Sequence, residues 1–374
     1  MAKQANSLTQ LALQKFKRNF WGVFSLIYII LCGLVALCAY QLAPDDSQNA
    51  NQMHLSIHSQ KPGFTVKMLT VPGEVGGEQS RFERFFMGKK SADTEIPISS
   101  FELKNDEIEY VPYNEDDEMN LIKSIERNNF KNSKIDWEQS AFAKAYITER
   151  TFLLGTDKYG RDLLSRMLIG ARISFSIGFV AVLISLLIGI FLGSLAGFYG
   201  GKVDAAIMWI INVTWSIPTL LLVIAITLAL GKGFWQVFIA VGLTMWVEVA
   251  RVVRGQVISV KQMQYVTAAR ALGYRNSRII IWHILPNIIA PVIVISAANF
   301  AGAILIESGL SFLGIGAQPP TPSWGAMIKD HYSYIILGKA YLAIIPGLAI
   351  MFLVMAFMLV GNALRDALDV KGGS

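Results

Sequence analysis

The chain has 374 residues, of which 53% are apolar and 16% are charged, and its mean hydropathy is +0.45. Soluble domains hold about 45–50% apolar and about 25% charged residues, so a disordered chain, a collagen and a typical cytosolic enzyme are excluded and a membrane protein is indicated. The net charge of +6 is uneven, −6 over residues 43–165 and +12 over the rest, without a soluble basic patch that would favour nucleic acid.

Six stretches are long and apolar enough to cross a membrane, which takes about 20 residues. They cover residues 19–44, 173–201, 205–231, 233–250, 279–306 and 340–364. We expect the first to be a retained anchor, because it is longer than the apolar region of a cleaved signal peptide. The fourth contains Glu248, which we expect to pair with Arg251 near one membrane face.

Basic residues without neighbouring acids flank the spans on one side of the membrane. Four lie before the first span: Lys3, Lys15, Lys17 and Arg18. Six lie in or after the end of the fourth span: Arg251, Arg254, Lys261, Arg270, Arg275 and Arg278. By the positive-inside rule, both termini and this loop are expected in the cytoplasm.

The spans divide the chain into four parts: a cytoplasmic segment (1–19), a first transmembrane helix (20–43), an extracytoplasmic segment (44–165) and a five-span core (166–370). The third part is polar and long enough for a small inserted α+β domain. Its patterns predict strands at 64–71 and 107–111 and helices at 120–130 and 135–150.

The outer segment offers no catalytic chemistry in its sequence. It has no cysteine, and its acidic run at 115–118 lacks the glycine-bearing loop of a calcium site. The two cysteines of the chain, Cys32 and Cys38, lie inside the first span, and the four histidines are scattered. We therefore expect no metal site and no bound cofactor.

Small residues and a short loop carry the remaining local signals. Gly189, Gly193 and Gly197 fall on one helical face, where they allow close helix packing in lipid. After the fourth span, Thr267–Leu272 predicts a short helix that ends at Gly273 in a left-handed conformation. A second helical piece follows, and Pro286 is expected to break it. Ala268 and Ala269 are expected to offer a flat face of small residues, and taken alone this segment is an amphipathic connector.

The loop resembles the EAA loop of ABC importer permeases. It matches the spacing of that motif at Ala268, Ala269, Gly273, Leu285 and Pro286, and it departs from it at Thr267 and His283. Further motifs resemble the peptide and nickel branch, closest to the C-type permease subunit of dipeptide and oligopeptide importers; they lie at 154–162, 165–172, 196–204, 217–219, 311–316, 320–325 and 364–369. Asn212 and Asn362 stand where this branch has aspartate, so no charge-dependent role follows there.

The resemblance implies an all-α integral membrane protein: a six-span ABC importer type I permease bundle, here with an inserted extracytoplasmic α+β domain after the first span. It implies that the coupling loop, 254–286 with Tyr265, Ala268 and Ala269, docks on a cytoplasmic ATPase. The implied partners are a homologous second permease, two ABC ATPases, an extracytoplasmic substrate-binding protein and the lipid of a bacterial cytoplasmic membrane.

The chain itself lacks a GxxxxGK[ST] phosphate loop, so we expect no enzyme activity and expect ATP and Mg²⁺ to be used by partner ATPases. Glu307, near the outer end of the fifth span, either lines the translocation path and meets a peptide amino group or lies at the membrane boundary. The cargo stays open between peptides, nickel chelates and other small solutes. An ion-coupled secondary transporter would need more acids deep in the spans, and a membrane receptor would not need a docking motif.

Overall fold

The computed structural model describes residues 8–73, 79–90, 93–114, 121–130, 138–231 and 233–368. The acidic run at 115–118 lies outside these residues. The chain forms two compact units, one of residues 1–34, 173–318 and 347–374 and the other of residues 35–172 and 319–346. The second unit therefore includes a segment, 319–346, that the sequence division placed in the five-span core.

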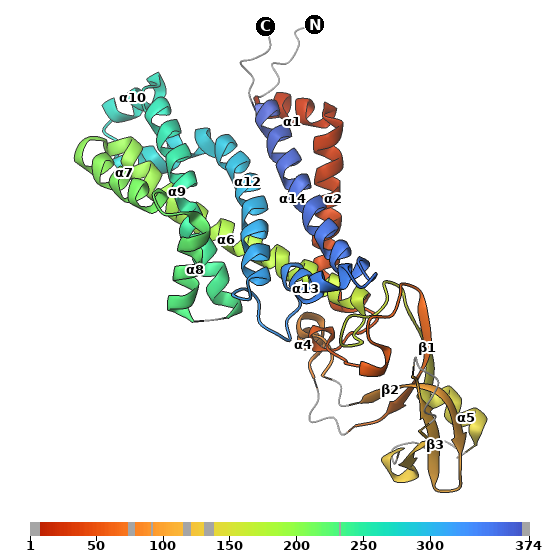
Figure 1. Cartoon of the computed structure of the whole chain (residues 1–374). Helices are drawn as coiled ribbons and strands as arrows, with labels where there is room; N and C mark the ends of the chain where they lie inside the picture. Colours follow the sequence, from red (N-terminus) through yellow and green to blue (C-terminus); the bar gives the residue numbers. More distant parts are fainter. Residues whose placement is uncertain are drawn as a thin grey trace, which may run out of the picture. The chain divides into compact units, whose positions relative to one another are not determined.

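Most of the first unit is made of long apolar helices (Figure 1). The helices with most of their length in this unit are α1 (Leu8–Arg18), α2 (Phe20–Leu37), α6 (Leu163–Tyr199), α7 (Gly201–Trp215), α8 (Thr219–Leu230), α9 (Phe234–Val260), α10 (Gln264–Ala271), α11 (Asn276–Arg278), η4 (Ile279–Ile284), α12 (Leu285–Phe312) and α14 (Tyr341–Leu368). Five continuous helical stretches of the described chain are long and apolar enough to span a membrane, or six spans result if α7 and α8 count as one.

The third span is broken, which the sequence reading did not predict. Helices α7 and α8 meet at an angle of 91° (Figure 1). Pro218 precedes α8, lacks a backbone N–H and disfavours helical geometry at Ile217. The count of six spans thus holds only with this bent pair as one span.

Helices α6 and α9 pack closely through the three glycines, as the sequence predicts. A Cβ placed on Gly189 would lie 2.5 Å from the Val249 Cβ, and one placed on Gly193 would lie 2.6 Å from the carbonyl oxygen of Ala250. Both distances are shorter than van der Waals contact allows. Larger side chains would therefore force the two backbones apart.

The second unit holds an antiparallel five-stranded sheet in the order β4-β3-β2-β1-β5. The strands are β1 (Phe64–Val71), β2 (Thr94–Leu103), β3 (Glu107–Pro112), β4 (Lys123–Glu126) and β5 (Ile147–Phe152). The short helices of this unit are α3 (Ala39–Leu42), η1 (Gln48–Ala50), η2 (Leu55–Ile57), α4 (Arg81–Met87), η3 (Arg127–Phe130), α5 (Gln139–Tyr146), α13 (Trp324–His331) and η5 (Tyr332–Ile335).

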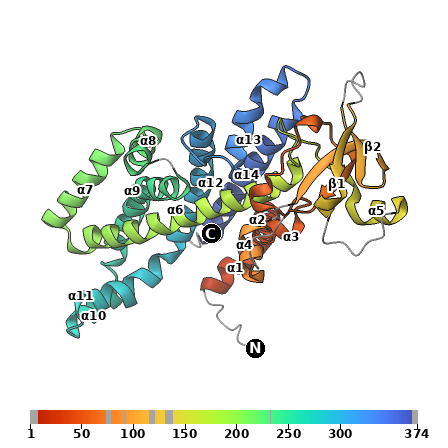
Figure 2. The ribbon, with the colours of Figure 1, turned by 90° about the horizontal axis from the view of Figure 1, so that it is seen from below.

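The sheet has a core of its own, in which Leu69, Ile98 and Ile108 contact Phe142 of α5. Figure 2 shows α5 beside β1 and β2. The two helices predicted for this region are partly wrong. Residues 123–126 pair with β3 as a strand, and the helix predicted over 135–150 ends at Tyr146, where the chain continues as β5. Pairing of these residues with β3 and β1 outweighs their helical propensity.

Residues 319–346 join the second unit through specific contacts. The Trp324 indole Nε1 donates to the carbonyl oxygen of Met167 at 3.0 Å, and a Cβ on Gly170 would lie 2.8 Å from the Trp324 ring. The Tyr341 hydroxyl donates to the carbonyl oxygen of Gln60 at 2.6 Å. These contacts bring together sequence motifs that lie more than 150 residues apart.

A buried ionic cluster fixes the chain just before α6. The Asp157 carboxylate is fully buried and accepts a hydrogen bond from Arg161 Nε at 2.7 Å, and Arg166 Nε lies 3.6 Å from the same oxygen. Arg161 also donates to the side-chain oxygen of Asn51 at 3.0 Å. The motif at 154–162 is therefore a structural joint between the inserted segment and the start of α6.

Candidate functional site

The predicted coupling loop forms α10, which ends in a Schellman motif. Gly273 has φ +77°, its N–H donates to the carbonyl of Arg270 at 3.0 Å, and the N–H of Tyr274 donates to the carbonyl of Ala269 at 3.2 Å. The first residue beyond such a helix end takes a left-handed conformation that favours glycine. The expected conformation of Gly273 is therefore confirmed.

The two alanines of the loop do not share one exposed face, contrary to the sequence reading. Ala269 is 4% exposed and packs with Val266, Ile279 and Ile284 against the spanning helices, whereas Ala268 is exposed. Adjacent residues on a helix point about 100° apart, which allows Ala269 to face the bundle while Ala268 faces solvent. Ala269 attaches α10 to the bundle, and Ala268 belongs to its free face.

The free face of α10 is made of residues spaced three and four apart, which lie on one side of a helix. They are Gln264, Thr267, Ala268 and Ala271, all exposed, and Leu272 beyond the helix end extends this surface with 72% exposure. We call these five residues the free face of α10. Tyr265, another residue of the predicted set, is 43% exposed, and partial burial raises the pKa of its phenol.

Pro286 does not break the second helical piece, so this prediction is wrong. The chain stays helical from Asn276 to Phe312, with Pro286 in the first turn of α12 and a π-helical segment, η4, directly before it. A π-helical turn shifts the hydrogen-bond register, which accommodates a residue without an N–H. The half-buried Leu285 and exposed Pro286 thus lie inside a continuous span, and α10 and α11 lie together (Figure 2).

Basic side chains around the loop are held against aromatic rings. The Arg278 guanidinium carbon lies 4.4 Å from the centre of the Tyr274 ring, which in turn stacks on His283 at 5.8 Å. Arg254 binds Asp204 through two hydrogen bonds of 2.5 and 2.6 Å, which ties α9 to the first turn of α7. The base of the coupling loop is therefore rigidly connected to two spans.

The expected pair of Glu248 and Arg251 does not form. Arg251 does not pair with Glu248; it donates to the side-chain oxygen of Asn212 at 2.8 Å and lies 3.5 Å from the centre of the Trp215 ring. Glu307 is fully buried in α12 and accepts a hydrogen bond from the Ser311 hydroxyl at 2.6 Å. Its predicted roles, on the translocation path or at the membrane boundary, stay predictions.

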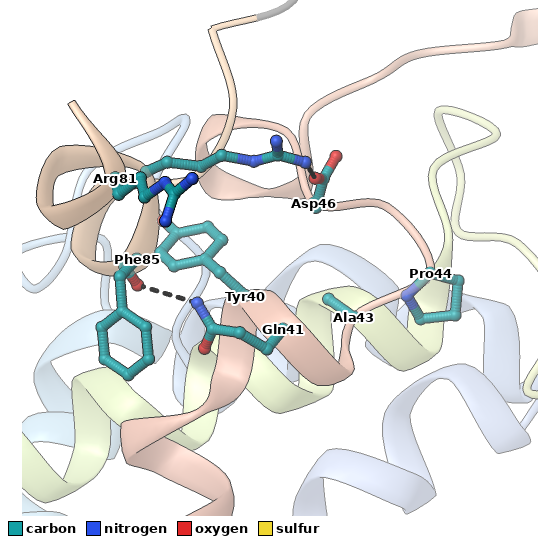
Figure 3. A pocket seen from close by; sticks show the side chains of 8 residues that line it. Tyr40, Gln41, Ala43, Pro44, Asp46, Arg81 and Phe85 are labelled. Carbon is teal, nitrogen blue, oxygen red and sulfur yellow. Dashed lines mark hydrogen bonds and ion pairs between the residues drawn. The ribbon is translucent and has the colours of Figure 1, made fainter. Parts of the chain in front are cut away.

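A pocket of about 620 Å³ lies in the second unit, beside the end of the first span (Figure 3). The Gln41 side chain donates to the carbonyl of Phe85 at 3.4 Å across it, and Arg84 pairs with Asp46 at 2.9 Å. The lining comes from α3, α4 and the chain between them. All of its lining residues belong to the second unit.

Two family models match the chain. Residues 189–371 match the model described as "Binding-protein-dependent transport system inner membrane component", and residues 7–62 match the "N-terminal TM domain of oligopeptide transport permease C". The first match contains α9, α10 and α12. The second contains α2 and the start of the inserted segment.

Curated relatives show the same similarity over most of their own length. The chain is 42% identical over 217 residues to the dipeptide transport system permease protein DppC of Alkalihalophilus pseudofirmus, covering 58% of this chain and 71% of the relative. It is 42% identical over 218 residues to the glutathione transport system permease protein GsiD of Pectobacterium atrosepticum, covering 58% and 72%. It is 40% identical over 217 residues to the oligopeptide transport system permease protein OppC of Bacillus subtilis, covering 58% and 71%.

Proposed function

The chain belongs to the family of binding-protein-dependent transport system inner membrane components, and from this we propose that it is the C-type permease subunit of an ATP-driven peptide importer. It forms half of the translocation pathway in a bacterial cytoplasmic membrane. The observation that carries this function is the free face of α10, an exposed helix that packs on the spanning bundle through Ala269 and ends at Gly273.

In this proposal, the free face of α10 docks in a cleft of a separate ATPase. The small side chains of Thr267, Ala268 and Ala271 allow close approach, and exposed Leu272 supplies an apolar contact. Because α10 is packed on η4 and tied through α9 to α7, a movement of the ATPase is transmitted to the spans. ATP and Mg²⁺ are then used by the ATPase subunits rather than by this chain.

The remaining partners follow from the architecture of such importers. A second, homologous permease completes the pathway, two ATPases supply the energy, and a substrate-binding protein delivers cargo from outside. The inserted five-stranded sheet lies on the outer side of the membrane in this arrangement. Its exposed surface contacts the binding protein or the second permease.

A nickel-chelate or other small-solute permease is the second candidate for the cargo. The relatives include proteins whose names specify dipeptides, oligopeptides and glutathione, so permeases this similar differ in cargo. All three named cargoes contain peptide bonds, which favours peptides. An ion-coupled carrier would need several acids deep in its spans. It is disfavoured because the stretch from the start of α9 to the end of α12 contains only two acids, Glu248 and Glu307.

The proposed orientation predicts opposite labelling of two exposed serines. In a chain with Cys32 and Cys38 replaced by alanine, a cysteine at Ser100 in β2 should react with an impermeant thiol reagent added outside intact cells. A cysteine at Ser259, near the end of α9, should react only after the cells are opened, because the adjoining loop is basic and cytoplasmic. External labelling at position 259 with none at position 100 would reverse the topology.

Co-purification tests the proposed assembly. An affinity tag on this chain, solubilised in mild detergent, should bring down a second permease and an ATPase that mass spectrometry identifies. Recovery of the well-folded chain without an ATPase would contradict the proposal.

A further inference from the structure

A pocket of about 300 Å³ lies at the break of the third span. Both halves of the broken span line it, together with α9 and α12, and its polar lining residues are Thr214, Thr219, Thr244, Glu248 and Asn299. Its volume lies at the lower end of small-ligand sites. Polar groups within spanning helices are costly unless they find partners or line a water-filled cavity.

Glu248 is an exposed acid in the middle of a spanning helix. It lies fourteen residues after Phe234, the first residue of α9, or about 21 Å along the helix axis. The nearest base on this helix, Arg251, is occupied by Asn212 and by the Trp215 ring. The Glu248 carboxylate is therefore left to face the pocket, where a cation would stabilise it.

Asn299 supplies a second, independent feature of this pocket. Its side chain is 1% exposed and lines the pocket, and its Nδ2 has no hydrogen-bond acceptor among the residues that the structure describes. A buried amide N–H is stabilised only when an oxygen accepts from it. The pocket therefore fits a ligand that carries both a cationic group and an oxygen acceptor.

The break in the span adds further donors. The first backbone N–H groups of α8 have no acceptor within that helix, and Thr219, its first residue, lines the pocket. The positive end of the helix dipole also favours an anionic or carbonyl oxygen there. Donors and an acid thus surround one small volume.

We propose that this pocket is a cargo subsite for the main chain of a zwitterionic peptide, an inference that rests on the proposed transport function. Glu248 binds the terminal ammonium group. Asn299 and the first turn of α8 bind a peptide carbonyl or carboxylate oxygen. The subsite recognises the charges shared by all short peptides and does not select among their side chains.

Charged thiol reagents test the pocket without requiring transport. The chain, with Cys32→Ala and Cys38→Ala, carries Thr219→Cys and is assembled with its partner subunits in membranes. The rate at which the cysteine is modified is measured with two methanethiosulfonate reagents, a cationic one that carries trimethylammonium and an anionic one that carries sulfonate. Each rate is divided by the rate of the same reagent with a free thiol in solution. We expect Glu248→Gln to lower the ratio of the cationic to the anionic rate about ten-fold, because the carboxylate attracts the cationic reagent and repels the anionic one. An unchanged ratio, or a thiol inert to both reagents, would overturn the subsite.

Uptake provides the second measurement, with radiolabelled dialanine as the probe. Glu248→Gln should lower ATP-dependent uptake at least about ten-fold, as expected for the loss of a charge-assisted hydrogen bond, while ATPase subunits remain bound. Asp366→Asn, a loss of an exposed acid of α14, is the matched control and should leave uptake unchanged. Uptake at the unmodified rate in Glu248→Gln would contradict the subsite. Failure of the unmodified complex to take up peptide would instead contradict the transport function, and the thiol rates would still decide the pocket.

Discussion

Replacing Gly273 with valine is expected to abolish uptake while the spans remain inserted in the membrane. Gly273 has φ +77°, a conformation in which a β-branched residue is strained by about 1–3 kcal/mol. A Cβ at this position meets no atom within 4 Å, so the effect comes from the backbone and not from crowding. Relief of that strain unwinds the Schellman motif and tilts the free face of α10. The measurements are ATPase co-purification and peptide uptake.

Gly338 offers a matched control for this variant. It also has a positive φ, +75°, with no atom within 4 Å of a built Cβ, and it belongs to the second unit, whereas α10 belongs to the first. Gly338→Val therefore introduces similar strain and should keep its ATPase and most of its uptake. Equal loss in both variants would attribute the effect to general destabilisation. Normal ATPase retention and transport in Gly273→Val would show that the loop does not couple the subunits.

Replacing Asp157 with alanine should destabilise the protein more than any nearby surface change. The carboxylate is the shared partner of two buried guanidinium groups, those of Arg161 and Arg166. Its removal leaves these charges uncompensated in the interior, which typically costs about 3–5 kcal/mol. We expect the melting temperature of the detergent-solubilised protein to fall by roughly 10 °C.

The neighbouring Lys158 provides the comparison. Its ammonium lies 3.0 Å from Asp330, and both side chains are partly exposed, at 22% and 33%. Such pairs contribute about 0–1 kcal/mol, so Lys158→Ala should melt within a few degrees of the unmodified protein. If Asp157→Ala melts at the same temperature as Lys158→Ala, the buried cluster is not the joint that we describe.

The span positions could be predicted from the sequence because burial in lipid demands long apolar runs. The break at Pro218 could not, since proline has different consequences at different places in this chain. Pro291 and Pro346 lie inside continuous helices, and Pro286 is accommodated by the π-helical segment before it. Packing against neighbouring helices decides whether the lost hydrogen bond ends a helix, and one sequence does not contain that information.

The coupling loop could be predicted in its turn chemistry but not in its orientation. Gly273 follows a short helical pattern and adopts the expected conformation because few other residues tolerate it. An eight-residue helix with mixed small side chains does not specify which side packs inward. Ala269 is buried by contacts with Ile279 and Ile284, which follow the turn after α10, and Ala268 is left exposed.

The candidate subsite shows the same limit. Glu248 is visible in the sequence as an acid within an apolar span, and proximity to Arg251 favoured a local pair. In the structure, Arg251 instead donates a hydrogen bond to Asn212 of α7, which lies far from it in the sequence. Asn299 gave no sequence signal, because a single amide in a span is also typical of helix packing.

ATP dependence of peptide accumulation tests the central claim, that this chain is the permease subunit of an ATP-driven importer. The complex purified through a tag on this chain is reconstituted in proteoliposomes, and the uptake of radiolabelled dialanine is measured with its binding protein present. We predict accumulation that requires hydrolysable ATP and persists when proton and sodium gradients are collapsed. Accumulation driven by either gradient in the absence of ATP would contradict the claim.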